Sequence, residues 1–214
     1  MQERSRILSK ISVRSLRTQR QLACFVIDVS SSMSERTIGG ISKIDALNTA
    51  INDLVRRLKD SSIARNFDFA IVTFSSHAEI YLDIKPLGEI NDISLRFTST
   101  HGGTNLTEAL ELAYNMITRY YSNNTENLHT SAVVLISTDG EPNIRTEELP
   151  ETAGKLKSIP DVTVACCFLP SLDERAEEAR NLMKNIVTSA NFLTEERDIE
   201  GIRNFFLQSI TKSR

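Results

Sequence analysis

Short runs of apolar residues alternate along the chain with segments whose apolar residues recur every three or four positions. A run that is apolar throughout, such as residues 22–27, is typical of a strand buried on both faces of a sheet. The runs predict strands at residues 22–29, 67–74, 78–84, 132–137 and 162–169, and a brief one at 191–193.

The segments between these runs have the periodicity of helices that bury one face. They predict helices over residues 44–58, 106–120, 146–157, 176–186 and 198–210. Ser42 is suited to cap the first of them. Pro150 is compatible with the third helix only in its first turn, because proline lacks a backbone N–H.

Alternating strands and helices of these lengths predict an α/β fold. We expect a doubly wound, mostly parallel sheet with helices on both faces, as in Rossmann-like proteins. The strands at 67–74 and 78–84 are separated by too few residues for a helical crossover, so they are expected to form one antiparallel edge hairpin.

The length of 214 residues suits a single domain. We expect this domain to span residues 21–214. Residues 1–20 form a basic arm, which we expect to be loosely ordered because chain ends usually are. Its charged residues are Arg4, Arg6, Lys10, Arg14, Arg17 and Arg20 against Glu3 alone.

Composition limits the classes of partner. The formal net charge of -3 gives no general attraction to nucleic acid. No stretch reaches the roughly 18 consecutive apolar residues of a membrane helix, so no membrane insertion is expected. Cys24, Cys166 and Cys167 lie inside apolar runs, where a free thiol behaves as a small hydrophobic side chain. With no export signal apparent, these thiols favour a reducing, cytoplasmic location.

Oxygen-bearing side chains are concentrated in three predicted loops. Asp28, Ser30 and Ser32 follow the first strand, Thr104 follows a Gly-Gly pair before a helix, and Asp139 follows the fourth strand. In open α/β sheets the binding crevice lies at the carboxyl ends of the strands, so these loops are expected to converge. Hydroxyl and carboxylate oxygens without histidine or thiolate suit a hard cation such as Mg²⁺ or Mn²⁺.

The order Asp-x-Ser-x-Ser, Gly-Gly-Thr and Asp-Gly, each at a strand or helix boundary, resembles the metal-ion-dependent adhesion site (MIDAS) of von Willebrand factor A (vWA) domains. The resemblance covers nearly the whole predicted domain. It implies that the hydroxyls of Ser30, Ser32 and Thr104 bind the cation directly. It also implies that Asp28 and Asp139 hold the cation largely through water.

A cation held by uncharged hydroxyls stays electron-poor and seeks an anionic ligand, which the resemblance implies is an Asp or Glu carboxylate on another protein. We interpret the chain as a non-catalytic, metal-dependent protein interaction module. The segment 138–142, Thr-Asp-Gly-Glu-Pro, resembles the stand-alone bacterial vWA proteins of tellurite-resistance and stress operons. That likeness implies a cytoplasmic adaptor for partners such as kinases, phosphatases or other stress-response proteins.

Three alternatives remain. A Mg²⁺-dependent phosphatase of the haloacid-dehalogenase type would use Asp28 as nucleophile, but Ser30 stands where its acid/base carboxylate is needed. A subunit of a chelatase-like, ATP-driven machine would present the same site to a motor partner. A purely structural metal site would need no partner. A serine hydrolase is disfavoured, because the chain has no Gly-x-Ser-x-Gly elbow.

Overall fold

A computed structural model describes residues 19–37, 40–90, 95–124, 129–140, 142–170 and 176–212. The basic arm, apart from residues 19 and 20, lies outside these described residues. Within them, strands and helices alternate along the chain as the apolar pattern predicts.

The strands form one six-stranded sheet in the order β3-β2-β1-β4-β5-β6. All neighbouring strands are parallel except β2 and β3, which confirms the predicted antiparallel edge hairpin. The strands are β1 (Gln19–Asp28), β2 (Phe67–Phe74), β3 (Ala78–Pro86), β4 (His129–Thr138), β5 (Val162–Phe168) and β6 (Leu193–Glu195).

Most strands differ from the sequence prediction at one end or at both, by one to three residues. β4, for example, begins at His129, three residues earlier than predicted. β1 begins at Gln19, three residues earlier than predicted, because Gln19 pairs with His129 of β4 and Arg20 binds buried Asp68 of β2. β6 begins two residues later than predicted, because residues 190–192 form a 3-10 turn instead. Tertiary contacts therefore extend β1 over polar residues and displace β6.

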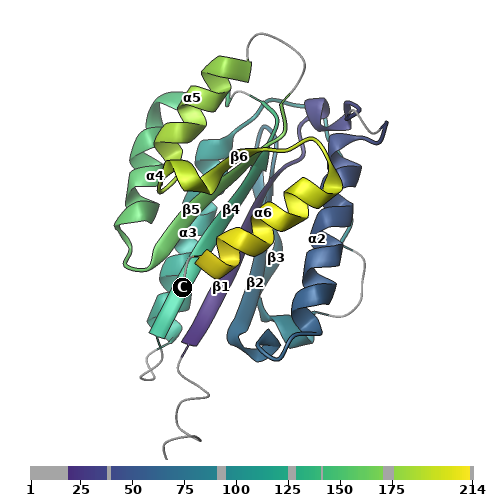
Figure 1. Cartoon of the computed structure of the whole chain (residues 1–214). Helices are drawn as coiled ribbons and strands as arrows, with labels where there is room; N and C mark the ends of the chain where they lie inside the picture. Colours follow the sequence, from purple (N-terminus) through teal and green to yellow (C-terminus); the bar gives the residue numbers. More distant parts are fainter. Residues whose placement is uncertain are drawn as a thin grey trace, which may run out of the picture.

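Helices cover both faces of the sheet (Figure 1), which confirms the doubly wound architecture. One apolar cluster joins the sheet to α2 and α6, and a second joins the opposite face to α3, α4 and α5. The rings of Phe25 in β1 and Phe206 in α6 meet edge to face, with centroids 5.5 Å apart. The helices are α2 (Lys43–Lys59), α3 (Leu106–Asn123), α4 (Leu149–Ser158), α5 (Ala176–Ile186) and α6 (Ile199–Lys212).

Local sequence signals begin the helices where expected. The Ser42 side chain accepts a hydrogen bond from the backbone N–H of Asp45 and so caps α2, and Pro150 lies in the first turn of α4. Asn105 caps α3 in the same way, through the N–H of Glu108. These caps fix where α2 and α3 start, next to the loops that carry the candidate ligands.

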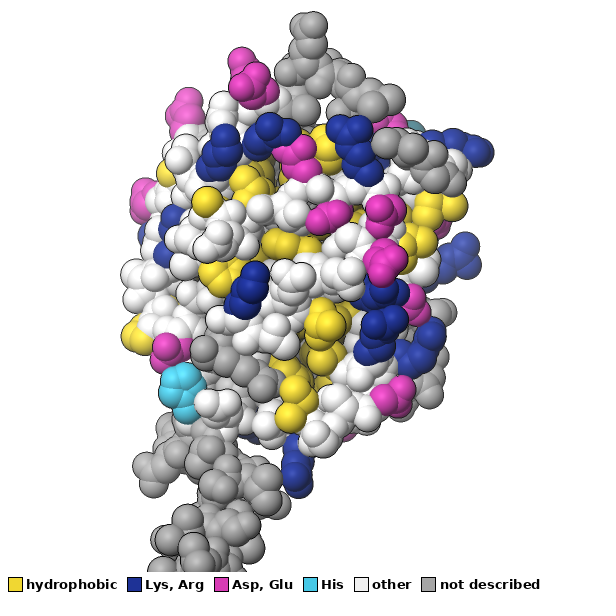
Figure 2. Space-filling view, viewed as in Figure 1, with side chains coloured by type: hydrophobic (Ala, Val, Ile, Leu, Met, Phe, Trp, Pro, Cys, Tyr) yellow, Lys and Arg dark blue, Asp and Glu magenta, His cyan; other side chains and the backbone are white. Residues whose placement is uncertain are grey.

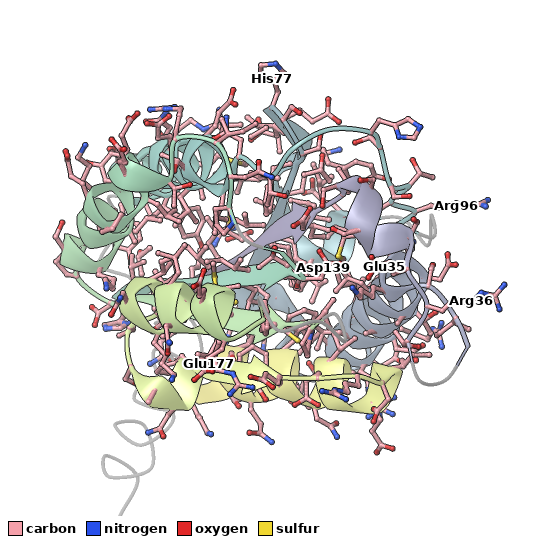
Figure 3. All side chains as sticks on the ribbon, turned by 90° about the horizontal axis from the view of Figure 1, so that it is seen from above. Glu35, Arg36, His77, Arg96, Asp139 and Glu177 are labelled. Atoms are coloured by element: carbon pink, nitrogen blue, oxygen red, sulfur yellow. The ribbon has the colours of Figure 1, made fainter. Side chains whose placement is uncertain are left out.

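The strand order places a topological switch point between β1 and β4. The helix that follows β1, α2, packs on one face of the sheet, and the helix that follows β4, α4, packs on the other face. The connections from these neighbouring strands therefore run to opposite faces. Such a switch point leaves a crevice at the carboxyl ends of the strands. Asp28 is the last residue of β1 and Asp139 directly follows β4, so both lie at this crevice. Figure 3, which views the molecule along this direction, shows Asp139 near the centre.

The charge on the surface and the length of the helices are the features that concern nucleic acids and membranes as partners. Figure 2 shows Lys and Arg side chains interspersed with Asp and Glu over the face that carries α2 and α6, instead of forming one basic surface. Among the described residues, every helix is too short or too polar to cross a bilayer.

Candidate metal centre

Asp28 is fully buried at the end of β1, and both of its carboxylate oxygens accept hydrogen bonds. Oδ1 accepts from the backbone N–H of Ser30 at 2.8 Å, and Oδ2 accepts from Thr138 Oγ1 at 2.6 Å. Burial raises the pKa of Asp28 to about 6, although the bonds from Ser30 and Thr138 act to lower it. A buried carboxylate of this kind is stabilised by a cation close to it.

A line of side-chain hydrogen bonds crosses the crevice from the first loop to the fourth strand. Ser30 Oγ and Ser32 Oγ lie 3.1 Å apart, and Ser32 Oγ donates to Asp139 Oδ1 at 2.8 Å. Ser30 and Asp139 are buried, whereas Ser32 is partly exposed. Both ends of the line are therefore buried, and Ser32 in its middle is the member that solvent reaches.

Thr104 approaches the same crevice from the start of α3. A Cβ at Gly140 would lie 3.8 Å from Thr104 Oγ1 and 4.0 Å from Ser32 Oγ. The hydroxyls of two separate loops thus lie around a position that glycine leaves without a side chain. The structure brings together the five predicted residues, which come from three loops.

The Gly-Gly pair before Thr104 lets its loop pack closely against two others. Gly103 donates its N–H to Ser76 Oγ at 2.8 Å, and a Cβ at Gly103 would lie 2.6 Å from Asn143 Oδ1. Gly102 has a φ of 142°, which favours glycine. Asn143 Oδ1 accepts from Thr104 N at 2.9 Å, and Asn143 N donates to Thr104 O at 3.1 Å. Asn143 therefore holds Thr104 beside the loop that carries Asp139.

A buried lysine lies against the acidic end of this line. Lys43 Nζ donates to Asp139 Oδ2 at 2.7 Å and to Glu35 Oε2 at 2.9 Å. Figure 3 shows Glu35 beside Asp139 at the carboxyl end of the sheet. Asp139 is thus bonded on one oxygen by a serine hydroxyl and on the other by an ammonium group.

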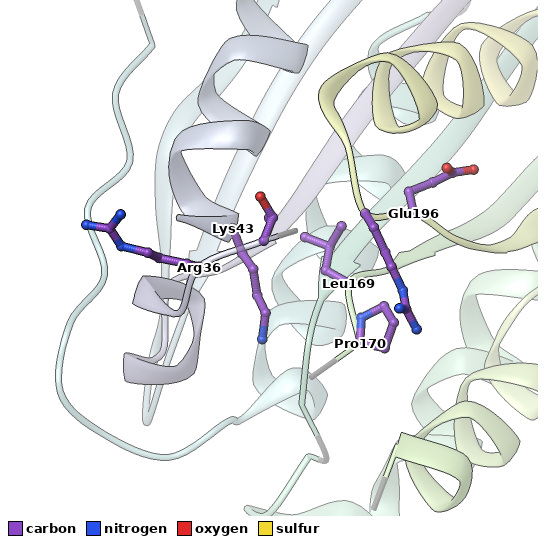
Figure 4. A pocket seen from close by; sticks show the side chains of 7 residues that line it. Arg36, Lys43, Leu169, Pro170 and Glu196 are labelled. Carbon is purple, nitrogen blue, oxygen red and sulfur yellow. The ribbon is translucent and has the colours of Figure 1, made fainter. Parts of the chain in front are cut away.

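Lys43 also lines a pocket of about 100 Å³ next to the crevice (Figure 4). Leu169 and Pro170, which follow β5, provide its apolar part. The other lining residues are Arg36, Thr37, Glu196 and Arg197. The pocket provides free volume directly beside the lysine side chain.

The donor set fits a hard divalent cation. Oxygen ligands with few charges are what Mg²⁺ and Mn²⁺ prefer, and these ions commonly keep several waters. Among the described residues, no group of three or more His, Cys, Asp or Glu side chains is arranged to hold a metal. A metal site built from a cluster of charged side chains is therefore not found among the described residues, and most of the candidate ligands are hydroxyl groups.

Three residues that hold the site together were missed by sequence reasoning. Thr138 is the last residue of β4 and Asn143 lies in the loop that follows, and their residue types alone do not indicate the bonds that they make to Asp28 and Thr104. Lys43 had a signal, because a lysine at the first position of a helix opposes the positive end of the helix dipole. This unfavourable interaction is weak, and a nearby anion offsets it.

The family comparison agrees with the fold. The model of the von Willebrand factor type A domain matches residues 23–141, more than half of the chain. The chain belongs to this family. No curated protein sequence matches it significantly.

Solved structures with the same fold come from several kinds of protein. The pilus adhesin SpaC of Lactobacillus rhamnosus GG superposes with a TM-score of 0.71 at 15% identity, over 92% of this chain and 31% of SpaC. Proximal thread matrix protein 1 of the mussel byssus, with a zinc-occupied MIDAS motif, gives 0.67 at 18% identity, over 92% and 46%. A von Willebrand factor type A protein of Catenulispora acidiphila gives 0.67 at 17% identity, over 91% and 43%.

These likenesses show the fold. The chain spans less than half the length of each of these three proteins.

Proposed function

We propose that the chain is a metal-dependent protein interaction module. The cation is Mg²⁺ or Mn²⁺, and the site is a MIDAS. Its residues are Asp28, Ser30, Ser32, Thr104 and Asp139. The line of hydrogen bonds from Ser30 through Ser32 to Asp139, which joins two loops around the position left open by Gly140, carries this proposal.

Each residue has a distinct part in this site. The hydroxyls of Ser30, Ser32 and Thr104 supply neutral oxygen ligands. Asp28 and Asp139 are buried and held by neighbouring donors, and they supply negative charge close to the cation. They are the only two carboxylates in the proposed set. The bound cation supplies a positively charged position that binds a carboxylate of a partner protein.

A binding role is favoured over phosphoryl transfer. Membership of the vWA family supports it, and so does Ser30, which stands where a haloacid-dehalogenase-type phosphatase needs an acid/base carboxylate. Thr138 also donates a hydrogen bond to Asp28 Oδ2, so this oxygen of the carboxylate, which a phosphatase would use as nucleophile, already accepts a bond within the protein. The solved structures of similar fold include an adhesin and a matrix protein.

We place the module in the cytoplasm, as an adaptor in a bacterial stress-response or signalling complex of the tellurite-resistance type. The Thr-Asp-Gly-Glu-Pro segment at 138–142 and three buried free cysteines support this placement. Partners of this type are kinases, phosphatases or other stress proteins. The domain organisation that we propose is the single vWA domain expected over residues 21–214 and preceded by the basic arm 1–20, except that the last two residues of the arm, 19 and 20, belong to β1.

Metal binding is the first test of the proposal. Purified wild-type protein should bind one equivalent of Mn²⁺, followed by the loss of the free Mn²⁺ electron paramagnetic resonance signal, and Mg²⁺ should displace it. The variant carrying Asp28→Ala and Ser30→Ala should bind at least about tenfold more weakly. Ser31→Ala is the matched control, because Ser31 is exposed and lies between the two proposed serine ligands. Equal binding by all three proteins would overturn the metal site.

Partner binding is tested with the same three proteins as bait in a bacterial lysate, each with Mg²⁺ and with EDTA. We expect proteins that are retained by wild type and Ser31→Ala only with Mg²⁺. Retention of the same proteins in every condition would contradict binding through the metal. If the double variant binds no metal, loses much of its stability and captures the same proteins as wild type, the metal is structural.

The chelatase-like alternative predicts one particular kind of captured protein. In that case the metal-dependent partner would be an ATPase, and its rate of ATP hydrolysis would change when the wild-type module is added. An adaptor would instead retain its partner without any nucleotide.

A further inference from the structure

Lys43 occupies a position that is unfavourable for a cation in two respects. It is the first residue of α2, where the helix dipole is positive, and its side chain is only 5% exposed. Lysine is almost never buried to this extent unless it is paired. Its partners at 2.7 Å and 2.9 Å are Asp139 and Glu35, and the Asp139 side chain is fully buried whereas that of Glu35 is 55% exposed.

The ammonium group of Lys43 therefore stabilises the Asp139 carboxylate and does not stabilise the start of α2. Without a cation nearby, a fully buried Asp139 carboxylate would be costly, because one serine hydroxyl does not compensate for its charge. Lys43 supplies a full positive charge in contact with Oδ2, on the opposite oxygen from Ser32. The ammonium compensates the same carboxylate that the proposed metal would use.

We propose that Lys43 is a built-in counter-cation of the metal site, which competes with the divalent ion for Asp139 and lowers the affinity of the domain for metal. This inference rests on the proposed function. It adds a regulatory property to that site: the domain alone binds the metal weakly, and a partner carboxylate, by adding negative charge, strengthens metal binding.

The electrostatic reason is repulsion between like charges at short range. A divalent cation near Asp139 lies close to an ammonium group that is held 2.7 Å from the same carboxylate, in a partly desolvated crevice. At the effective dielectric constant of protein surfaces, repulsion over such distances changes a binding constant by an order of magnitude or more. Glu35 acts in the opposite sense, because it attracts the ammonium group away from Asp139.

The surroundings give Lys43 room to respond. Its side chain borders the pocket of about 100 Å³ next to Leu169 and Pro170 (Figure 4). When a metal binds, the ammonium group can withdraw from Asp139 while it keeps Glu35 as its partner. A rigid structural ion pair would need no such space.

The test compares Mn²⁺ affinity among four variants in the full chain. Lys43→Gln removes the charge and keeps a hydrogen-bond donor, and Lys43→Met removes both. We expect each to bind Mn²⁺ on the order of tenfold more tightly than wild type. Lys43→Arg keeps the charge and should bind like wild type. Glu35→Gln removes the competing anion and should bind several-fold more weakly.

Other outcomes would overturn the inference. If Lys43 only orients Asp139, Lys43→Gln and Lys43→Met bind Mn²⁺ more weakly than wild type. If Lys43→Arg binds as tightly as Lys43→Gln, the effect is one of space and not of charge. Should Lys43→Met fail to fold, the Lys43→Gln and Glu35→Gln pair still decides, because the expected changes have opposite signs. Wild type that binds no Mn²⁺ at all would contradict the proposed function, whereas wild type that binds while Lys43→Gln binds no tighter contradicts this inference alone.

Discussion

Thr138 Oγ1 donates a 2.6 Å hydrogen bond to Asp28 Oδ2, and so joins the end of β4 to the end of β1 across the switch point of the sheet. The two residues lie 110 positions apart in the sequence. The same threonine oxygen accepts from the N–H of Gly140 at 3.3 Å. Thr138 thus orients the buried carboxylate of one loop and the backbone of the other.

Replacing Thr138 with valine should weaken both the fold and the metal site. Valine has nearly the same shape but leaves Asp28 Oδ2 without its donor, so the charged carboxylate is less well stabilised. We expect the free energy of unfolding at pH 7.5 to fall by about 1–3 kcal/mol, measured with urea, and the Mn²⁺ affinity to fall as well. Thr49→Val, at an exposed position of α2, is the control. Unchanged Mn²⁺ binding in Thr138→Val would show that this bond does not support the site.

The raised pKa of Asp28 predicts how stability without metal depends on pH. Its pKa in the folded protein is about 6, against an ordinary value of 3.8. The folded state therefore binds the proton more tightly than the unfolded state. The resulting stabilisation is complete below about pH 4 and is lost as the pH rises through 6, which amounts to about 3 kcal/mol.

Asp28→Asn should remove this dependence. In EDTA at pH 7.5 the variant should be more stable than wild type, by up to about 3 kcal/mol, because no buried carboxylate has to ionise. At pH 4 the two should be nearly equal. Added Mg²⁺ should stabilise wild type and leave the variant unchanged. A variant less stable than wild type in EDTA at pH 7.5 would mean that the ionised carboxylate is required by the fold itself.

The sequence predicted the parts of the molecule that depend on local pattern. Continuous apolar runs located the strands, and Asp28 and Asp139 could be assigned to one crevice because both follow such runs. The start of β1 was missed because Gln19 and Gln21 are polar. Gln19 is held in the sheet by pairing with β4, and Gln21 by pairing with both β2 and β4. Residue periodicity does not contain that information.

The contacts between side chains could not be predicted in the same way. Lys43 and Asp139 lie 96 positions apart and meet only because α2 begins next to the end of β4. Asn143 pairs with the backbone of Thr104 through a loop conformation that depends on two glycines. Such contacts follow from the folded geometry, so the sequence located the candidate ligands but not the residues that hold them.

Gly103→Ala tests whether the Thr104 loop must pack closely. The added Cβ would lie 2.6 Å from Asn143 Oδ1 and 2.9 Å from Ile144 Cδ1, so the two loops must move apart. We expect a loss of about 1–3 kcal/mol of stability and Mn²⁺ binding weaker by about tenfold. Gly154→Ala is the matched control, because a Cβ there meets nothing within 4 Å and α4 should gain about 0.5–1 kcal/mol. Wild-type Mn²⁺ affinity in Gly103→Ala would argue against a role for Thr104.

A cluster at the opposite end of the sheet offers a variant that should lower stability without affecting the metal site. Buried Asp68 accepts a hydrogen bond from Tyr120 Oη at 2.6 Å and is paired with Arg20, whose two contacts measure 2.7 Å and 3.0 Å. Tyr120→Phe removes one donor from a buried carboxylate. We expect a loss of about 1.5–3 kcal/mol in the free energy of unfolding.

The Mn²⁺ affinity of Tyr120→Phe should equal that of wild type, because the cluster lies at the amino ends of the strands and the candidate ligands lie at their carboxyl ends. Mutations far apart with no shared partner act independently. A reduced affinity in Tyr120→Phe would mean that metal binding simply follows global stability. In that case, weaker binding by Thr138→Val or Gly103→Ala would no longer identify those residues with the site.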